Sequence, residues 1–230
     1  SNKIIIIASK KLSAKIKKEI HEIPKENFII EPSAKNTAPA IGLAAIHILK
    51  RNKNSLMAIY PSDHLIDGDY EFQDTIKNSE KLIKQKSCLV TIGVRPTYPA
   101  VGYGYIYHEQ SIEKSKIFKI ISFTEKPSLA KAKKFISNGN YLWNAGIFIW
   151  KTKSILDEIS KFMPDLYENL FYIYDSIMTK KYSTILTERW ELINPESIDY
   201  GILEKSKEIY TIKSDFKWND LGSWKSLFNI

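Results

Sequence analysis

Short apolar segments alternate with amphipathic segments through the first part of the chain, and this alternation constrains the fold more than any other sequence feature. Short apolar runs bounded by polar residues are typical of buried strands, and we predict strands over residues 3–8, 28–30, 56–60 and 88–94. Helical periodicity predicts helices over residues 13–21, 37–50 and 72–84. Strands that alternate with helices in this way indicate an α/β sheet built from crossover connections.

The second half of the chain follows a different pattern. Two strands are predicted over residues 103–108 and 117–123 with no helix between them. Further strands are predicted over residues 143–150 and 209–212, and helices over residues 128–137, 154–162, 164–178, 197–205 and 223–228. No repeat, low-complexity segment or linker interrupts the sequence. We therefore predict a single α/β domain over residues 1–230, with a mixed, mostly parallel sheet flanked by helices.

Composition argues against several kinds of partner. No run of about 18 apolar residues is present, so we expect no membrane-spanning helix, and the N-terminus lacks the pattern of a signal peptide. Net charge is +8, yet only three of the 34 basic residues are arginine, the residue on which nucleic-acid readers rely for bidentate contacts. We therefore expect no nucleic-acid partner. The one cysteine, Cys88, lies in an apolar run, which indicates a buried thiol and a cytoplasmic protein.

Polar residues that directly follow apolar strands are candidates for chemistry, because ligands of open α/β sheets bind outside the carboxyl ends of the strands. Asp63 follows the strand over residues 56–60, and its carboxylate suits Mg²⁺ held between protein and substrate phosphates. Asp220, in a segment with two tryptophans, is a second candidate, since Mg²⁺ commonly takes one or two carboxylates. A turn or a helix cap is the simpler explanation of each aspartate. We interpret His64 as a structural residue rather than a ligand or base.

Three further groups of residues could bind a sugar or a phosphate, although each also has a purely structural explanation. Gly104 would let the main chain approach a sugar hydroxyl closely, although a hairpin turn explains a glycine there equally well. Glu125 could fix sugar hydroxyls and Lys126 a phosphate, unless the two form an exposed surface pair. Asn144 places an amide among apolar and small residues, where it needs a hydrogen-bond partner that substrate could supply.

Taken together, these segments resemble the mannose-1-phosphate guanylyltransferases, also called GDP-mannose pyrophosphorylases. Seven motifs occur in the order typical of that family: Glu31-Pro32 with Asn36-Thr37-Ala38-Pro39-Ala40, Pro61-Ser62-Asp63-His64, Gly102-Tyr103-Gly104-Tyr105-Ile106, Glu125-Lys126-Pro127, Trp143-Asn144-Ala145-Gly146, Ser197-Ile198-Asp199-Tyr200 and Trp218-Asn219-Asp220-Leu221-Gly222-Ser223-Trp224. No single motif is decisive, but seven in register are specific. The resemblance runs from near residue 4 to residue 230.

The resemblance implies a GT-A-like nucleotidyltransferase fold. It also implies the reaction of GTP with mannose 1-phosphate to give GDP-mannose and pyrophosphate, with Mg²⁺. By the same resemblance, Asp63 and Asp220 are the catalytic metal ligands and Lys126 lies near the sugar phosphate. The mannose hydroxyls would be held by three residues, Gly104, Glu125 and Asn144.

On the nucleotide side, the resemblance implies that Glu31, Asn36 and Thr37 line the site. Asp199 would lie at the edge of the sugar pocket or support it from behind. Such a set agrees with the chemistry, because the sugar phosphate attacks the α-phosphorus directly. Positioning and neutralisation of developing charge then supply most of the rate, and no nucleophilic serine or cysteine is needed.

One part of the family pattern has no counterpart in this sequence. Family members open with a strand, a glycine-rich loop containing arginine and a Pro-Lys pair, and the loop wraps the triphosphate with backbone amides. The first predicted strand here, residues 3–8, resembles a later strand of the same half-domain, so we expect this sequence to lack the first strand-loop-helix unit. We expect this chain alone to have little or no activity, because loss of even one preorganised donor costs about 10²–10³ in rate.

Two alternatives stay open at the level of sequence. The chain could belong to a nucleotidyltransferase of other base or sugar specificity, although the segment from Asn36 to Pro39 favours the guanylyl type. It could instead be a non-catalytic or split-enzyme half that binds sugar nucleotide. Either a homodimer or a partner polypeptide that supplies the N-terminal segment would fit the second alternative.

Overall fold

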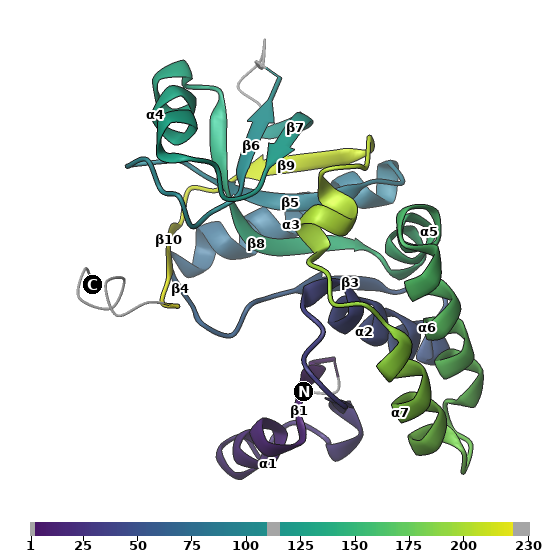
Figure 1. Cartoon of the computed structure of the whole chain (residues 1–230). Coiled ribbons are helices and arrows are strands. Elements are labelled where there is room, and N and C mark those ends of the chain that lie inside the picture. The colour runs from purple at the N-terminus through teal and green to yellow at the C-terminus, as the bar shows by residue number, and fades with distance from the viewer. Residues whose placement is uncertain (1–2, 110–115, 223–230) are drawn as a thin grey trace. The chain divides into compact units, whose positions relative to one another are not determined.

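The computed structural model describes residues 3–109 and 116–222, and the chain forms two compact units (Figure 1). Unit 1 comprises Ser1–Ser55 and Ile155–Ile202, and unit 2 comprises Leu56–Ser154 and Leu203–Ile230. Each unit is therefore assembled from two stretches that are distant in sequence, and the strands of the two units belong to separate sheets. The single domain over residues 1–230 stays a prediction.

Unit 1 contains a small parallel sheet joined by a helical connection. β1 (Ile6–Ser9) pairs with β2 (Phe28–Glu31), and the chain between them forms α1 (Lys10–Glu19) and the short helix η1 (Lys25–Asn27). α1 contacts both strands. The helix begins earlier than the periodicity predicted because Ser9 caps it, with the Ser9 hydroxyl accepting a hydrogen bond from the Leu12 amide.

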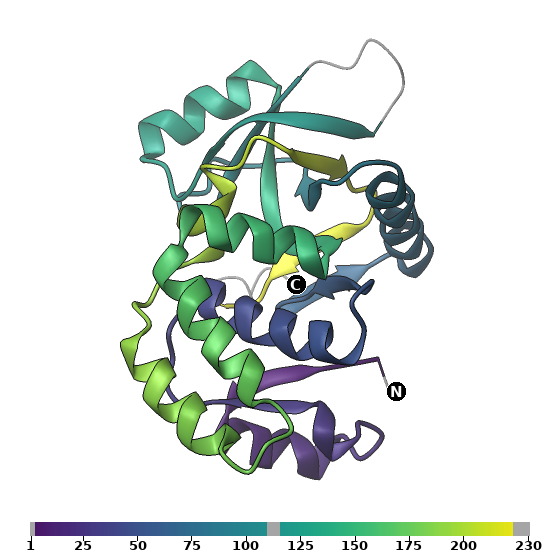
Figure 2. The same ribbon diagram turned by 90° about the vertical axis from the view of Figure 1, so that its right-hand side faces the viewer.

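The rest of unit 1 is helical. Its helices are α2 (Thr37–Arg51), α5 (Thr152–Phe162), α6 (Pro164–Ser176) and α7 (Tyr182–Leu192). α2 packs against α6, and α6 packs against α7, as Figure 2 shows for the blue and green helices. The sequence pattern missed α7, because its apolar residues do not gather on one face of the helix.

Unit 2 is built on a six-stranded sheet in the order β3-β8-β5-β9-β7-β6. Its strands are β3 (Leu56–Ile59), β5 (Leu89–Val94), β6 (Tyr105–His108), β7 (Ile117–Thr124), β8 (Tyr141–Lys151) and β9 (Ile209–Lys213). β6, the last strand in this order, also pairs with the N-terminal part of the long strand β8. Two helices, α3 (Asp69–Gln85) and α4 (Leu129–Asn138), contact β8.

The sheet is mixed and accompanied by helices, as expected, but antiparallel pairings outnumber parallel ones among the described strands. The parallel pairings are β1 with β2 and β5 with β9. β8 lies between β3 and β5 and runs antiparallel to both. β3 and β5 are therefore parallel to each other, as their crossover through α3 requires, but they do not pair directly. The predicted mixed sheet flanked by helices is confirmed, and β3, β5, β6 and β9 run in the same direction, but their direct pairings are mainly with antiparallel strands. Alternation along the chain reveals the crossover between β3 and β5 but does not reveal that β8 is inserted between them.

Two short strands of unit 2 were also missed. β4 (His64–Asp67) and β10 (Lys217–Asp220) pair antiparallel in a separate two-stranded sheet. Both contain aspartate, which is uncommon in strands, so the sequence favoured turns. A π-helical segment, η2 (Asp199–Leu203), stands within the helix predicted over residues 197–205. The helical turn predicted over residues 223–228 lies outside the described residues.

The core of unit 2 lies where α3 meets the sheet. It joins Ile83 of α3 to Val90, Ile92 and Ile147, all fully buried. Cys88 belongs to the same core, and burial raises the pKa of its thiol to about 11. The predicted buried thiol is thereby confirmed.

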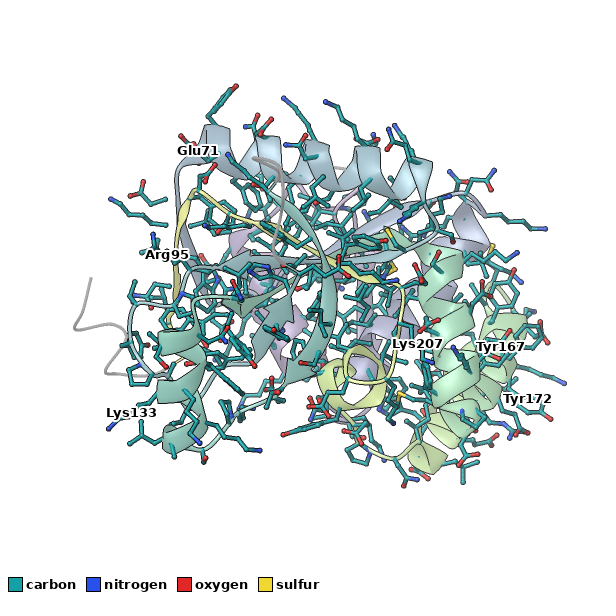
Figure 3. The ribbon with its side chains drawn as sticks, turned by 90° about the horizontal axis from the view of Figure 1, so that it is seen from above. Glu71, Arg95, Lys133, Tyr167, Tyr172 and Lys207 are labelled. Carbon is teal, nitrogen blue, oxygen red and sulfur yellow. The ribbon has the colours of Figure 1, made fainter. Side chains whose placement is uncertain are left out.

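Most of the described basic residues of unit 2 are exposed, and they are spread over several elements. Lys133 on α4, labelled in Figure 3, and Lys207, two residues before β9, are both exposed. Dispersed lysines of this kind are typical of a solvated surface rather than of a nucleic-acid groove. Within residues 3–109 and 116–222, no helix has the length and apolar character needed to cross a membrane.

Candidate active site

The two candidate metal ligands, Asp63 and Asp220, are brought together by the pairing of β4 with β10. In that ladder Asp220 stands opposite His64, the residue after Asp63. The amide of Leu221 donates a hydrogen bond to the Asp63 carbonyl at 2.9 Å, which extends the pairing by one step. Two aspartates that lie 157 positions apart in the chain are therefore neighbours in space.

Both carboxylates face the same point beside Gly222. A methyl group added there would lie 2.8 Å from Asp220 Oδ1 and 3.6 Å from Asp63 Oδ2. Asp220 Oδ1 also accepts a hydrogen bond from the Gly222 amide at 2.7 Å. Carboxylate oxygens are the ligands that Mg²⁺ prefers, so this pair fits a divalent cation completed by water or phosphate oxygens. The described residues hold no group of three or more histidine, cysteine or acidic side chains suited to a metal.

His64 holds this strand pair in place. Its Nδ1 accepts a hydrogen bond from Trp218 Nε1 at 3.1 Å, and the two rings meet edge to face with centroids 5.2 Å apart. Since an indole nitrogen only donates, the proton of the neutral imidazole lies on Nε2. Burial lowers the pKa of His64, while the charges of Asp220 and Asp63 oppose that change. These contacts give His64 the structural role that the sequence suggested.

An aromatic chain connects the carboxylate pair to the rest of unit 2. The Tyr103 ring packs edge to face on both Trp218 and Trp143, with centroids 5.2 Å apart in each case. Tyr98 also packs edge to face on Trp143, with centroids 4.9 Å apart, and its hydroxyl lies 3.5 Å from that of Tyr103. Burial raises the pKa of Tyr103 above its ordinary range. The carboxylates are thus held at a defined position relative to β8 and the glycine loop.

β8 contributes the Asn144 motif to the same region. Gly146 adopts a φ of 68°, and a methyl group there would lie 3.5 Å from both His64 Cε1 and Pro61 Cγ. A positive φ in mid-strand favours glycine, and this one lets the loop before Asp63 approach β8. Two of the seven motifs, the one that contains Asp63 and the one that contains Asn144, are therefore in contact in the structure.

Asn144 is buried and has internal hydrogen-bond partners. Its Oδ1 accepts from Thr91 Oγ1 at 2.6 Å and from the Gly146 amide at 3.2 Å. Its backbone amide donates to the Gly104 carbonyl at 2.8 Å. The protein itself therefore supplies the hydrogen-bond partners that the Asn144 side-chain oxygen was expected to need. Thr91, which fixes this oxygen, carried no signal in the sequence beyond its place in a strand.

Gly104 and Glu125 are in close contact. A methyl group on Gly104 would lie 2.6 Å from Glu125 Oε2 and 2.7 Å from Phe123 Cζ, distances that real Cβ atoms do not adopt. Only glycine leaves room for the Glu125 carboxylate at this place. The glycine thus serves to admit a side chain, where the sequence suggested a ligand or a turn.

Glu125 and Lys126 form an ion pair, with Lys126 Nζ 3.3 Å from Glu125 Oε1. The Glu125 side chain is only 10% exposed, so the pair is not the freely solvated one that the sequence allowed. Burial raises the pKa of Glu125, while Lys126 lowers it. Lys126 adopts a φ of 43° directly before Pro127, a conformation that the following proline disfavours.

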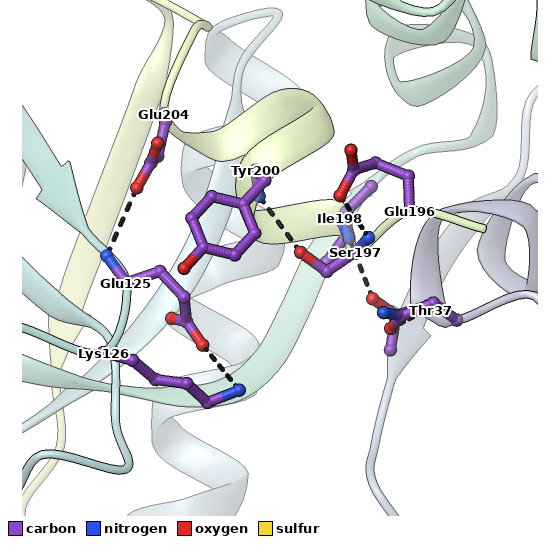
Figure 4. A network of polar contacts seen from close by, with 9 residues as sticks. Thr37, Glu125, Lys126, Glu196, Ser197, Ile198, Tyr200 and Glu204 are labelled. Atoms are coloured by element: carbon purple, nitrogen blue, oxygen red, sulfur yellow. Dashed lines mark hydrogen bonds and ion pairs between the residues drawn. The ribbon is translucent and has the colours of Figure 1, made fainter. Parts of the chain in front are cut away.

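Glu204 is a residue that the sequence analysis missed. Its Oε1 accepts a hydrogen bond from the Glu125 amide at 3.2 Å (Figure 4). The carboxylate lies directly after η2, 79 positions along the chain from the residue that it holds. Because its partner is a backbone group, no sequence motif could have indicated the contact.

Unit 1 carries the four residues expected on the nucleotide side or at the edge of the site: Glu31, Asn36, Thr37 and Asp199. Glu31 ends β2 and is half-buried, and burial raises its pKa. Asn36 has a φ of 72° and caps α2 by accepting from the Thr37 amide at 2.8 Å. The helix predicted over residues 37–50 therefore begins at the expected residue, Thr37.

A second tie holds the start of α2 in unit 1. Thr37 Oγ1 accepts a hydrogen bond from the Ile198 amide at 2.8 Å, and the Ala38 amide donates to the Glu196 carbonyl at 3.0 Å (Figure 4). Asp199 follows Ile198 and opens η2. The Asn36 and Asp199 motifs are therefore joined within unit 1.

The predicted site residues thus fall into two groups. Six lie in unit 2: Asp63, Gly104, Glu125, Lys126, Asn144 and Asp220. Among them Asp63 and Asp220 form one pair, and Gly104 contacts both Glu125 and Asn144 while Glu125 pairs with Lys126. Four lie in unit 1: Glu31, Asn36, Thr37 and Asp199. The last part of the seventh motif, Ser223-Trp224, lies outside the described residues.

The fold and these side chains are those of an α/β nucleotidyltransferase. The family described as Nucleotidyl transferase matches residues 1–230, and the chain belongs to it. It is 34% identical over 239 aligned positions to mannose-1-phosphate guanylyltransferase 2 of Escherichia coli O157:H7, covering 99% of this chain and 49% of that protein. It is 33% identical to the xanthan biosynthesis protein XanB of Xanthomonas campestris pv. campestris strain B100, covering 88% of this chain and 43% of that protein.

A solved structure agrees with these relatives. The crystal structure described as mannose-1-phosphate geranyltransferase from Thermus thermophilus superposes with a TM-score of 0.85 and 25% identity. The match covers 97% of this chain and 62% of that one. The chain spans about half the length of the curated relatives described above.

Proposed function

We propose that this chain is part of an enzyme that transfers GMP from GTP to mannose 1-phosphate, giving GDP-mannose and pyrophosphate. The observation that carries the proposal is the meeting of Asp63 with Asp220 in the same unit as the Gly104–Glu125 contact. The names of the relatives support the choice of substrates. The xanthan relative supports a role of GDP-mannose in supplying a polysaccharide.

Each group in unit 2 has a role in this proposal. Glu125 accepts hydrogen bonds from mannose hydroxyls, and the Gly104 main chain lines the same pocket. Lys126 offsets the charge of the sugar phosphate from its place beside Glu125. Asn144 holds the Gly104 carbonyl through its backbone amide, so it shapes the sugar pocket from the β8 side.

In unit 1, the start of α2 would face the nucleotide. Asn36 and Thr37 lie at a helix N-terminus, where backbone amides and the helix dipole favour negative charge. Glu31 and Asp199 would contribute hydrogen-bond acceptors to ribose, base or sugar. These assignments follow the resemblance in sequence.

Asp63 and Asp220 would hold Mg²⁺, which when bound supplies positive charge to the phosphate groups. The protein's own contribution is to keep the two carboxylates together through β4, β10 and the His64–Trp218 hydrogen bond. No side chain is required as a covalent nucleophile, because the sugar phosphate itself attacks.

Thermal denaturation of the chain with sugar nucleotides tests the proposal. A ligand at about 100 times its Kd stabilises the native state by about 2.7 kcal/mol, which raises the melting temperature measurably. We expect GDP-mannose with Mg²⁺ to raise it more than UDP-glucose or dTDP-glucose at the same concentration. A larger shift with either of the other two would reassign the base or sugar. No shift with any of the three would contradict the proposal.

Asp63→Asn and Asp220→Asn provide the matched test of the metal. Each variant keeps the side-chain size but removes a charge, so we expect Mg²⁺ to enhance GDP-mannose binding less in either variant. Asp67→Asn is the control, because this exposed aspartate on β4 pairs with Lys217 instead. Equal Mg²⁺ enhancement in all variants would remove the metal role from Asp63 and Asp220.

A further inference from the structure

The turn after β7 is held in an unfavourable backbone conformation. Lys126 is one of three described non-glycine residues with positive φ, and it is the one that precedes a proline. A residue before proline strongly prefers extended backbone. Strain of this kind persists only where the surrounding structure over-determines it, and it concentrates at ligand sites. Something must therefore hold the turn between Glu125 and Pro127.

Glu204 is the described side chain that holds the backbone of this turn. Its Oε1 accepts the Glu125 amide hydrogen at 3.2 Å, as Figure 4 shows. Leu203, the preceding residue, is only 3% exposed and so anchors the segment. Glu204 itself is exposed, so its carboxylate is not placed there by the packing of a core.

The choice of a carboxylate for this task is electrostatically unfavourable. Glu204 lies near the already buried carboxyl of Glu125 and adds to the rise in its pKa. A neutral acceptor would hold the amide without this cost. A charged acceptor makes a stronger hydrogen bond than a neutral one, which suits a turn that has to be kept against strain.

We propose that Glu204 is a positioning residue for sugar binding, which acts by fixing the Glu125–Lys126 turn. This inference rests on the proposed function. With the Glu125 amide held, the Glu125 carboxylate stays against Gly104 and the Lys126 ammonium stays beside it. Glu204 touches the backbone of Glu125 and acts on the sugar only through that residue.

Isothermal titration of GDP-mannose and of GDP into the full chain tests this role. Glu204→Ala removes the acceptor, and we expect affinity for GDP-mannose to fall about tenfold, because a hydrogen bond to a charged group is lost. Affinity for GDP, which lacks the sugar, should change less than about twofold. Glu204→Gln keeps an amide oxygen that can accept from Glu125, so we expect it to recover most of the lost affinity.

Glu208→Ala is the control, because it removes the same charge from an exposed position of unit 2 paired with Lys119. It should leave both affinities as in the wild type. The inference is overturned if Glu204→Ala binds GDP-mannose as tightly as the wild type, or if it loses GDP and GDP-mannose equally. Failure of the wild-type chain to bind GDP-mannose would instead overturn the proposed function, and this inference with it.

Discussion

At the scale of single residues, the proposed sugar-binding group depends on a residue that has no side chain, Gly104. Gly104 leaves the space that Glu125 Oε2 and Phe123 Cζ occupy. A lone glycine in a Gly-x-Gly pattern carries little information, and the sequence suggested close approach of a ligand or a hairpin. The structure adds a steric reason for glycine at this position, which is that only glycine leaves room for the Glu125 carboxylate.

Gly104→Ala should therefore weaken sugar binding with little change of fold. The added methyl group must displace Glu125 or Phe123, and overpacking of this kind typically costs about 1–3 kcal/mol. We expect GDP-mannose affinity, measured by titration calorimetry, to fall about tenfold or more. Gly102→Ala is the matched control, since nothing lies within 4 Å of a methyl group at that position. Equal losses of GDP-mannose affinity in the two variants would contradict the specific steric role of Gly104.

The buried carboxyl of Glu125 should leave a signature in the pH dependence of stability. Burial raises its folded-state pKa above the ordinary 4.5, so the folded state holds its proton to higher pH than the unfolded chain does. Stability contributed by the protonated form is then lost as pH rises through that interval. Glu125→Gln cannot lose this proton, so its melting temperature should gain on that of the wild type as pH rises above about 4.5.

Glu208→Gln serves as the comparison for this measurement, because it changes an exposed carboxylate that pairs with Lys119. It shows how removal of an exposed carboxylate from the same unit changes the melting temperature over the same pH range. If the melting temperature of Glu125→Gln instead falls relative to that of the wild type as pH rises, the assigned direction of the Glu125 pKa shift is contradicted.

At the scale of elements, the proposed metal ligands are brought together by a two-stranded ladder that the local sequence does not predict. β4 and β10 are short and contain aspartate, and neither reads as a strand. In the ladder Asp220 lies opposite His64, and the Trp218 ring of β10 packs edge to face on the His64 ring of β4. The Trp218–His64 hydrogen bond is therefore one of the contacts that hold the two carboxylates together, beside the strand ladder and the Leu221–Asp63 hydrogen bond.

A double-mutant cycle measures that contact. Trp218→Phe removes the indole donor, His64→Phe removes its acceptor, and the double variant removes both. We expect a coupling free energy of unfolding of about 0.5–1.5 kcal/mol, as for a hydrogen bond between neutral partners. Denaturant unfolding of the four proteins gives this value. A coupling near zero would mean that the ladder holds without this hydrogen bond.

At the scale of the whole molecule, the chain is assembled as two units that each combine distant stretches of sequence. In unit 1, His47 of α2 and the Tyr182 hydroxyl of α7 share a hydrogen bond of 2.7 Å. Burial, with a smaller contribution from Arg51, lowers the pKa of His47 to about 4. A neutral histidine is thus part of the packing between α2 and α7, and it must stay neutral for the unit to be stable.

This histidine predicts acid sensitivity. Since the folded pKa of about 4 lies below the ordinary 6.5, the unfolded chain takes up the proton first as pH falls. Stability should decline between about pH 6.5 and 4, and His47→Phe should show a smaller decline in melting temperature over that range. The exposed His21, changed to glutamine, is the control and should follow the wild type. An unchanged pH dependence in His47→Phe would contradict the prediction.

The sequence by itself determined the α/β class, most helices and strands, and the identity of the candidate residues. Those features are encoded locally, in apolar periodicity, in caps such as Asn36 and Ser128, and in polar residues after strands. Only the tertiary structure decided that β8 enters antiparallel between β3 and β5, and that Glu204 reaches the amide of Glu125. The physical reason is that strand partners and hydrogen bonds to backbone groups are chosen across long sequence separations, where side-chain identity at either end carries almost no signal.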